Sequence, residues 1–124
     1  MLETIINITV ALYIVEMNLT KKKCKPCEGG TKPMGKSEAS KYIKLVPEWS
    51  LKKGCIVRDF RFKDFSGALS FINKVGKIAE GEGHHPDILL HSWNRVKLVL
   101  STHAITGISQ NDFIVAAKVD RLVG

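Results

Sequence analysis

Residues 65–102, FSGALSFINKVGKIAEGEGHHPDILLHSWNRVKLVLST, decide the fold of this chain. In the first half of the stretch, apolar residues recur at the spacing of one helix face: Phe65, Ala68, Leu69, Ile72, Val75 and Ala79. Gly81 and Gly83 follow the last of these residues and favour a helix end. The pattern therefore predicts a helix over Phe65–Glu80.

The second half of the stretch predicts two strands, over Asp87–Trp93 and Arg95–Thr102. In the second strand, alternate residues share a face: Val96, Leu98 and Leu100 on one side, Lys97, Val99 and Ser101 on the other. If this alternation continues, His103 at the end of the strand lies on the Lys97 face.

The flanking sequence supplies the remaining elements: a helix over Ser37–Val46, a hairpin of strands Trp49–Lys53 and Cys55–Phe62 joined at Gly54, and a last helix that Ser109 opens. Ser37 can cap the first helix and Pro47 stops it. The predicted class is α+β: helices on one face of an antiparallel four-stranded sheet, in the order α-β-β-α-β-β-α.

The N-terminal part of the chain predicts little regular structure. Residues 21–36 contain five residues that interrupt helices and strands: Pro26, Gly29, Gly30, Pro33 and Gly35. We therefore expect residues 1–36 to be an extension and linker, and residues 37–124 to be the folded domain. The apolar run Ile5–Val15 is shorter than the about 20 residues of a membrane span. It also lacks the flanks of a signal peptide. We interpret it as an appended, dispensable segment, with an extra edge strand or a natural start at Met17 as alternatives.

The charge of the chain bears on its partners. Among 124 residues, 19 Lys and Arg stand against 12 Asp and Glu, a formal net charge of +7. Residues 21–63 hold 13 basic and 4 acidic residues, whereas residues 64–124 hold 6 of each. A short lysine run such as 21–23 is typical of a solvated surface. No aromatic stacking platform accompanies it. We therefore expect neither nucleic acid nor a membrane as a partner.

The three cysteines are Cys24, Cys27 and Cys55. An odd number in a small chain does not indicate a disulfide framework, and it favours a reducing compartment such as the cytoplasm. Cys24 and Cys27 have the spacing of half a zinc site, but Cys55 alone does not complete it. We therefore expect no metal site, and a structural or redox role for Cys24 and Cys27 stays open. We expect Cys55 to be a core residue.

Three of the four histidines fall at predicted element boundaries, where functional residues concentrate: His84, His85 and His103. Imidazole gains and loses a proton near neutral pH, so these side chains suit acid–base catalysis. Nearby carboxylates that can orient them are Glu80, Glu82, Asp87 and Asp112. The fourth histidine, His91, lies within a predicted strand and is interpreted as a surface residue.

Two further candidates also have structural explanations. Asp112 stands three residues after Ser109, where the acid of a capping box belongs, and that can be its whole role. Trp93 at a strand end is more often a packing residue than a ligand contact. No glycine-rich phosphate loop, serine nucleophile elbow or HExxH pattern is present in the sequence. Most nucleotide-dependent, hydrolase and metalloprotease chemistry is thereby excluded.

The combined spacing of these residues resembles the signature of the pterin-4a-carbinolamine dehydratases: Glu80, His84-His85-Pro86, Trp93, His103 and Asp112. The runs HHPDI (84–88), WNRV (93–96) and STH (101–103) are similar to those of bacterial-type members. The resemblance covers Ser37–Leu122, and a weaker likeness includes residues 24–30.

The resemblance implies the α+β fold given above, assembled as a homodimer or homotetramer. It implies removal of water from a 4a-hydroxytetrahydropterin to give the quinonoid dihydropterin, in the recycling of the reduced pterin that aromatic amino acid hydroxylases use. No metal or organic cofactor is implied. His84 and His103 are then catalytic and His85 shares the proton transfer or holds the pterin. The residues that bind substrate or orient the imidazoles are Glu80, Pro86, Trp93 and Asp112.

The chain departs from the resemblance at Ala104-Ile105-Thr106, where many members have smaller residues, often a glycine before Gly107. This difference is expected to alter substrate fit at the pocket rim more than the chemistry. Two alternatives stay open: a non-catalytic protein-binding module like the coactivators among the animal relatives, or a similar role on another pterin, such as in molybdenum-cofactor metabolism.

Overall fold

The computed structural model describes residues 18–26 and 32–124. From residue 36 onward its elements are α2 (Lys36–Ile43), β1 (Ser50–Lys52), β2 (Cys55–Arg61), α3 (Phe65–Glu82), β3 (Asp87–His91), β4 (Arg95–Leu100), the 3-10 helix η1 (His103–Ile105) and α4 (Gln110–Asp120). A helical turn over residues 18–21 precedes them. The predicted α+β class and the predicted order of helices and strands are confirmed.

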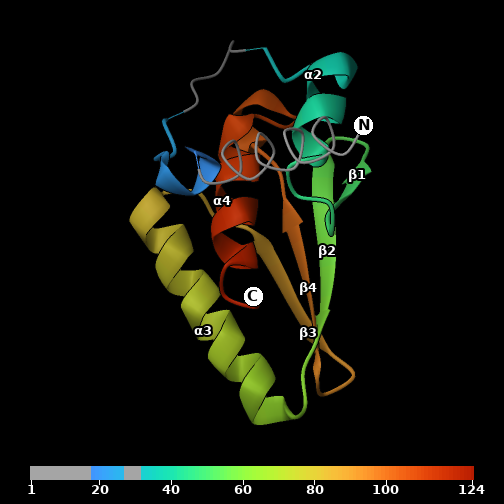
Figure 1. The fold of residues 1–124 in the computed structure, drawn as a ribbon, viewed down its shortest axis with the longest axis vertical. Coiled ribbons are helices and arrows are strands. Elements are labelled where there is room, and N and C mark those ends of the chain that lie inside the picture. Colours follow the sequence, from blue (N-terminus) through green and yellow to red (C-terminus); the bar gives the residue numbers. More distant parts are fainter. Residues whose placement is uncertain (1–17, 27–31) are drawn as a thin grey trace, which may run out of the picture.

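The four strands form one antiparallel sheet in the order β1-β2-β4-β3. Figure 1 shows α3 and α4 on the same side of this sheet. The predicted alternation in β4 is confirmed, because Val96, Leu98 and Leu100 are fully buried and face the helices. Both predicted hairpins are present, with Lys52 opposite Cys55 in one and His91 opposite Arg95 in the other.

Helix α4 forms the centre of the core. Figure 1 shows it between α3 and the sheet, and every residue from Asn111 to Ala117 is buried. Its C-terminal end is tied to the sheet by Asp120, which accepts hydrogen bonds from Arg58 at 2.6 Å and from the Trp49 indole at 2.8 Å. A helix apolar on most of its circumference must be enclosed on several sides, which explains this central place.

Helix α3 is longer than the sequence predicts. It begins after Asp64, whose carboxylate caps the helix by accepting a 2.7 Å hydrogen bond from the Gly67 N–H. It continues through Gly81, so the prediction that Gly81 helps to end it is wrong. Gly83 ends it instead, in the left-handed conformation at φ 65°, which glycine adopts without steric cost.

Other predicted boundaries need correction. Ser37 lies inside the first turn of α2, because Gly35 is the N-cap, and the helix ends at Ile43 rather than Val46. Strand β4 ends at Leu100, so the strand alternation does not reach His103. There the Thr102 N–H donates to the Gly107 carbonyl at 2.7 Å, and this bridge turns the chain into η1.

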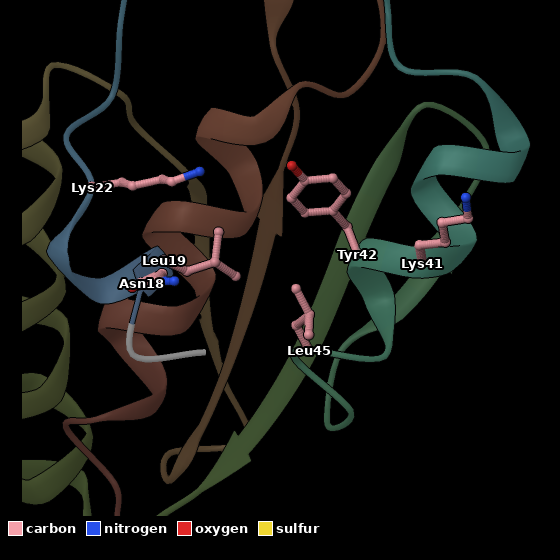
Figure 2. A pocket seen from close by; sticks show the side chains of 6 residues that line it. All are labelled: Asn18, Leu19, Lys22, Lys41, Tyr42 and Leu45. Carbon is pink, nitrogen blue, oxygen red and sulfur yellow. The ribbon is translucent and has the colours of Figure 1, made fainter. Parts of the chain in front are cut away.

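Segments N-terminal to residue 37 also contribute to the core. Leu19 and Cys24 belong to the same buried cluster as α4, and Figure 2 shows Leu19 beside that helix. The Met34 N–H donates to the Ile108 carbonyl at 2.8 Å. A Cβ on Gly107 would lie 2.6 Å from the Cβ of Pro33, so glycine permits this close approach. The domain boundary at residue 37 stays a prediction, but core packing extends beyond it.

Two predictions lie outside the described residues: the interpretation of the run Ile5–Val15 as a dispensable segment or an extra edge strand, and the part of the Cys-x-x-Cys motif at Cys27. Within the described part of the chain, no helix has the length and apolar character needed to cross a membrane.

Candidate active site

The three predicted catalytic histidines line one cavity of about 360 Å³ at the end of the sheet where β3 begins and β4 ends. Gly83 turns the chain out of α3 so that His84 and His85 reach this place just before β3. The 3-10 helix η1 brings His103 to the same end of the sheet just after β4. The full lining is Lys25, Pro26, Gly83, His84, His85, Ser101, Thr102, His103, Ala104 and Asn111.

His84 is held by Asp112. The Nε2 atom of His84 lies 2.6 Å from Oδ1 of Asp112, and the carboxylate is fully buried while the imidazole is 11% exposed. Because an ionised carboxylate only accepts hydrogen bonds, this contact places the ring proton on Nε2. The Nδ1 atom of a neutral His84 is then the nitrogen that can take up a proton.

Asp112 also caps helix α4. Its second oxygen, Oδ2, accepts from the Ser109 N–H at 3.0 Å, and the Ser109 side chain completes the capping box. The same oxygen accepts a 2.8 Å hydrogen bond from the Thr102 hydroxyl. The predicted capping role is therefore confirmed, but it is not the whole role, because the other oxygen of the same carboxylate holds His84.

His85 has a very different environment. Its Nε2 lies 2.6 Å from Oε1 of Glu80, but the imidazole is 59% exposed and the carboxylate 81% exposed. Glu80 stands on the last turn of α3, so the helix end brings the two side chains together. An exposed pair of this kind is weakly held, because water competes for both partners.

His103 lies at the start of η1 and is exposed. The stretch that departs from the family resemblance forms this short helix and its end: Ala104 lines the cavity, Ile105 is buried, and Thr106 has a left-handed φ of 50°. A β-branched residue in this conformation is strained. A glycine at position 106 would fit here without strain.

Other predicted site residues lie elsewhere. Trp93 occupies the β3–β4 turn with φ 58° and 61% exposure. The five residues of β3 separate it from His85 and Pro86 by roughly 16 Å, at about 3.3 Å per residue. Pro86 adjoins the cavity in sequence but is not part of its lining. His91, at the end of β3, is half-buried and contacts Ser92 at 3.1 Å, away from the cavity.

Glu82 and Asp87 were the other carboxylates expected to orient imidazoles, and they do not contact the histidines. Asp87 is exposed at the start of β3. Glu82 pairs with Lys118 of α4 and accepts a 3.0 Å hydrogen bond from the Cys24 N–H. Burial of Glu82 acts to raise its pKa. The hydrogen bonds from Lys118 and Cys24 and the positive charges of Lys118 and Lys23 outweigh that effect, so the pKa of Glu82 lies below its ordinary value.

Sequence reasoning missed the part of the cavity lining that Lys25, Pro26 and Asn111 form. Only Asn111 has a feature that the sequence shows, because it directly precedes Asp112 in the first turn of α4. Its hydrogen-bond partner, Lys25, lies 86 positions away. Spacing along the chain cannot reveal a pairing between segments so far apart.

A second groove, of about 320 Å³, lies between the N-terminal helical turn and the α2 region (Figure 2). Its lining is Asn18, Leu19, Lys22, Lys41, Tyr42 and Leu45. This set contains neither imidazole nor carboxylate, so it offers no acid–base pair. Among the described residues, no group of three or more His, Cys, Asp or Glu side chains is placed to hold a metal ion.

Comparison with known proteins gives one consistent result. The sequence model of the Pterin 4 alpha carbinolamine dehydratase family matches residues 32–122. A relative from Alkaliphilus metalliredigens is 50% identical over 106 residues, covering 84% of this chain and 95% of the relative. One from Halorhodospira halophila is 49% identical over 108 residues, covering 86% and 98%. Both bear the name of pterin-4-alpha-carbinolamine dehydratases.

A crystal structure from Brucella melitensis, described as a transcriptional coactivator/pterin dehydratase, is similar at a TM-score of 0.71 and 30% identity. The similarity covers 75% of this chain and all of that one. Together these likenesses define an α+β enzyme of the hydro-lyase class. The chain belongs to the pterin-4a-carbinolamine dehydratase family.

Proposed function

We propose that this chain removes water from a 4a-hydroxytetrahydropterin by histidine acid–base catalysis and releases the quinonoid dihydropterin. The observation that carries the proposal is the cavity lined by His84, His85 and His103, with His84 fixed at 2.6 Å by a buried carboxylate. Family membership supplies the class of substrate.

The reaction needs two proton transfers and no redox change. The C4a–O bond breaks, and hydroxide is a poor leaving group, so an acid must protonate the departing oxygen. The neighbouring ring nitrogen loses its proton to a base as the C=N bond forms. One water molecule is released and no electron carrier is consumed. Positioned imidazoles can divide this work, and each is typically worth about 10²–10⁴ in rate.

We assign the base to His84 and the acid to His103 or His85. Asp112 accepts the Nε2 proton of His84, which leaves Nδ1 as the acceptor and stabilises the imidazolium that forms. His85 and His103 are more exposed, so they can exchange protons with solvent between turnovers.

We further propose that the protein works in the cytoplasm as a homodimer or homotetramer. The odd cysteine count supports the compartment. Strand β3 supports the assembly: it is an edge of the sheet and exposes Ile88 and Leu89, at 39% and 54%. An edge strand with exposed apolar residues tends to pair with another chain.

Stopped-flow decay of chemically generated 4a-hydroxytetrahydropterin tests the function. We expect the wild-type protein to accelerate the decay, and the double variant His84→Ala/His103→Ala to lose the acceleration. His91→Ala makes the same chemical change outside the cavity and should keep the wild-type rate. A folded wild-type protein that leaves the decay unchanged would falsify the proposal.

The same experiment bears on the two alternative functions, because each of them predicts a folded protein that does not accelerate the decay. The Brucella melitensis relative is described both as a coactivator and as a pterin dehydratase. A folded chain without turnover would therefore next be tested for binding of a dimerisation helix and for turnover of other reduced pterins. The cavity with its three histidines favours the enzyme, because a protein-binding surface has no need of a buried imidazole–carboxylate pair.

A further inference from the structure

The described half of the Cys-x-x-Cys motif, residues 24–26, lies at the candidate active site. Lys25 and Pro26 line the cavity together with the three histidines. Cys24 beside them is buried in the core. We call residues 24–26 the N-terminal wall, because Lys25 and Pro26 are the part of the cavity lining that comes from before residue 37, and Cys24 attaches them to the core.

Asn111 joins the N-terminal wall to α4. Its Oδ1 accepts a hydrogen bond from the Lys25 N–H at 3.0 Å, and its Nδ2 donates to the Lys25 carbonyl oxygen at 2.6 Å. Two bonds of opposite sense fix both the position and the orientation of the Lys25 backbone. Asn111 is 7% exposed, so water competes little for either bond.

A second attachment holds the wall to α3. The Cys24 N–H donates to Glu82 at 3.0 Å, and Glu82 pairs with Lys118 of α4. The Cys24 sulfur also lies 3.6 Å from the Asn111 carbonyl oxygen. The wall is therefore tied to the end of α3 and to the start of α4, the same two helix ends that provide His84 and Asp112.

Figure 2 shows the segment that leads into the wall passing beside α4, with the second groove separating it from Tyr42 and Leu45. The hydrogen bonds given above join the wall to α3 and α4. Asn111, which lines the cavity and holds Lys25 by both backbone groups, is the central one of these contacts.

We propose that Asn111 is a positioning residue for the substrate pocket. By holding Lys25, it sets where the N-terminal wall stands relative to the histidines, and so how tightly the pterin is bound. Adjacent residues of α4 then have separate tasks, since Asp112 orients His84 and Asn111 places the wall. This inference rests on the proposed function of the cavity.

The test combines kinetics with hydrogen exchange on the full chain. We expect Asn111→Ala to raise KM about tenfold with kcat within about threefold, because the binding lost is common to substrate and transition state. The Lys25 amide should exchange at least about tenfold faster, since its acceptor is gone. Asn73→Ala makes the same change on the exposed face of α3 and should alter neither quantity.

A second variant covers the case in which Asn111→Ala folds poorly. Pro26→Gly loosens the wall without altering α4, because it frees a backbone angle that proline fixes. We expect it to raise KM as well. The melting temperature should fall by only about 4 °C or less, because glycine also adds freedom to the unfolded chain.

The possible results separate the two proposals. An active wild type with unchanged KM in both variants would overturn this inference alone. A fall in kcat at unchanged KM and unchanged Lys25 exchange would also overturn it, because the effect would then run through Asp112 and His84. A wild type without turnover would overturn this inference together with the proposed function.

Discussion

The two adjacent histidines, His84 and His85, are each paired with a carboxylate at the same distance, 2.6 Å, yet they belong to different environments. The inner pair, His84–Asp112, is almost completely buried, and its carboxylate has further hydrogen bonds to Thr102 and Ser109. The outer pair, His85–Glu80, is mostly in solvent. Equal distances therefore do not mean equal energies, because burial and additional partners decide how firmly a contact is held.

Among the variants that test this comparison, we expect Asp112→Ala to have the largest effect on stability. It leaves His84, the Thr102 hydroxyl and the Ser109 N–H without their acceptor, so we expect a loss of about 3 kcal/mol in the free energy of unfolding. Turnover should fall as well. Urea denaturation measures the first quantity and stopped flow the second.

Asp64→Ala is the matched control for Asp112→Ala, because Asp64 caps α3 at an exposed position and its removal should cost about 1 kcal/mol. If the two variants lost the same stability, the inner pair would be no stronger than a surface cap.

Turnover of the single-histidine variants sharpens the comparison next. We expect His84→Ala and His103→Ala each to lower kcat by roughly 10²-fold or more with the fold intact. A near-normal rate in both, for protein with an unchanged circular dichroism spectrum, would contradict the assignment of acid–base roles.

The outer pair should respond less. We expect His85→Ala to lower kcat by about tenfold and Glu80→Gln by less than that, because water can replace a partner at an exposed site. The test is to measure kcat for both variants beside His84→Ala. A larger loss of kcat from His85→Ala than from His84→Ala would mean that the outer pair contributes more to turnover than the inner pair.

Stability against pH tests a further buried group, Glu82. Its pKa in the folded protein lies below the ordinary value of 4.5, so its stabilising contribution is present above that pH and is lost as the pH falls through the folded pKa. Glu82→Gln should therefore be less stable than wild type at neutral pH, with the difference shrinking below about pH 4.5. Urea denaturation across this range measures it, and a difference that does not change with pH would contradict the account.

The smallest expected effect concerns Thr106, which has a left-handed φ of 50° at the end of η1. Thr106→Gly removes this strain but adds freedom to the unfolded chain. We expect the net gain to be about 1 kcal/mol or less. Thermal unfolding measures it, and a clear destabilisation would mean that the threonine side chain contributes packing that outweighs the strain.

The features that could be predicted from the sequence are those in which buried apolar residues recur at a regular spacing. The helix from Phe65 and the alternation of β4 follow from apolar residues that face one core, so both are visible in sequence spacing. The capping box of Ser109 and Asp112 is equally local. The sequence indicated Asp112 as one of four carboxylates that can orient an imidazole, but it did not pair Asp112 with His84, because 28 positions separate the two residues.

The remaining features depend on contacts that the sequence does not place. Helix α3 continues through Gly81 and ends at Gly83, and the sequence does not show which of the two glycines takes the left-handed conformation. His103 lies outside β4 because Thr102 pairs with Gly107. The N-terminal wall was predicted as part of a linker, since the prolines and glycines of residues 21–36 interrupt helices and strands. Irregular backbone can still be held firmly, as Lys25 is by Asn111.

Asp112 both caps α4 and holds His84, and this has a consequence for the comparison of relatives. The capping box at the start of α4 favours an acid at this position even in a chain that has lost its chemistry. An intact carboxylate there says little about whether a homologue is active. The imidazole at position 84 carries more information, since the helix end does not require it. Among diverged copies of this domain, loss of His84 beside a retained Asp112 would mark those that natural selection preserves for their shape alone.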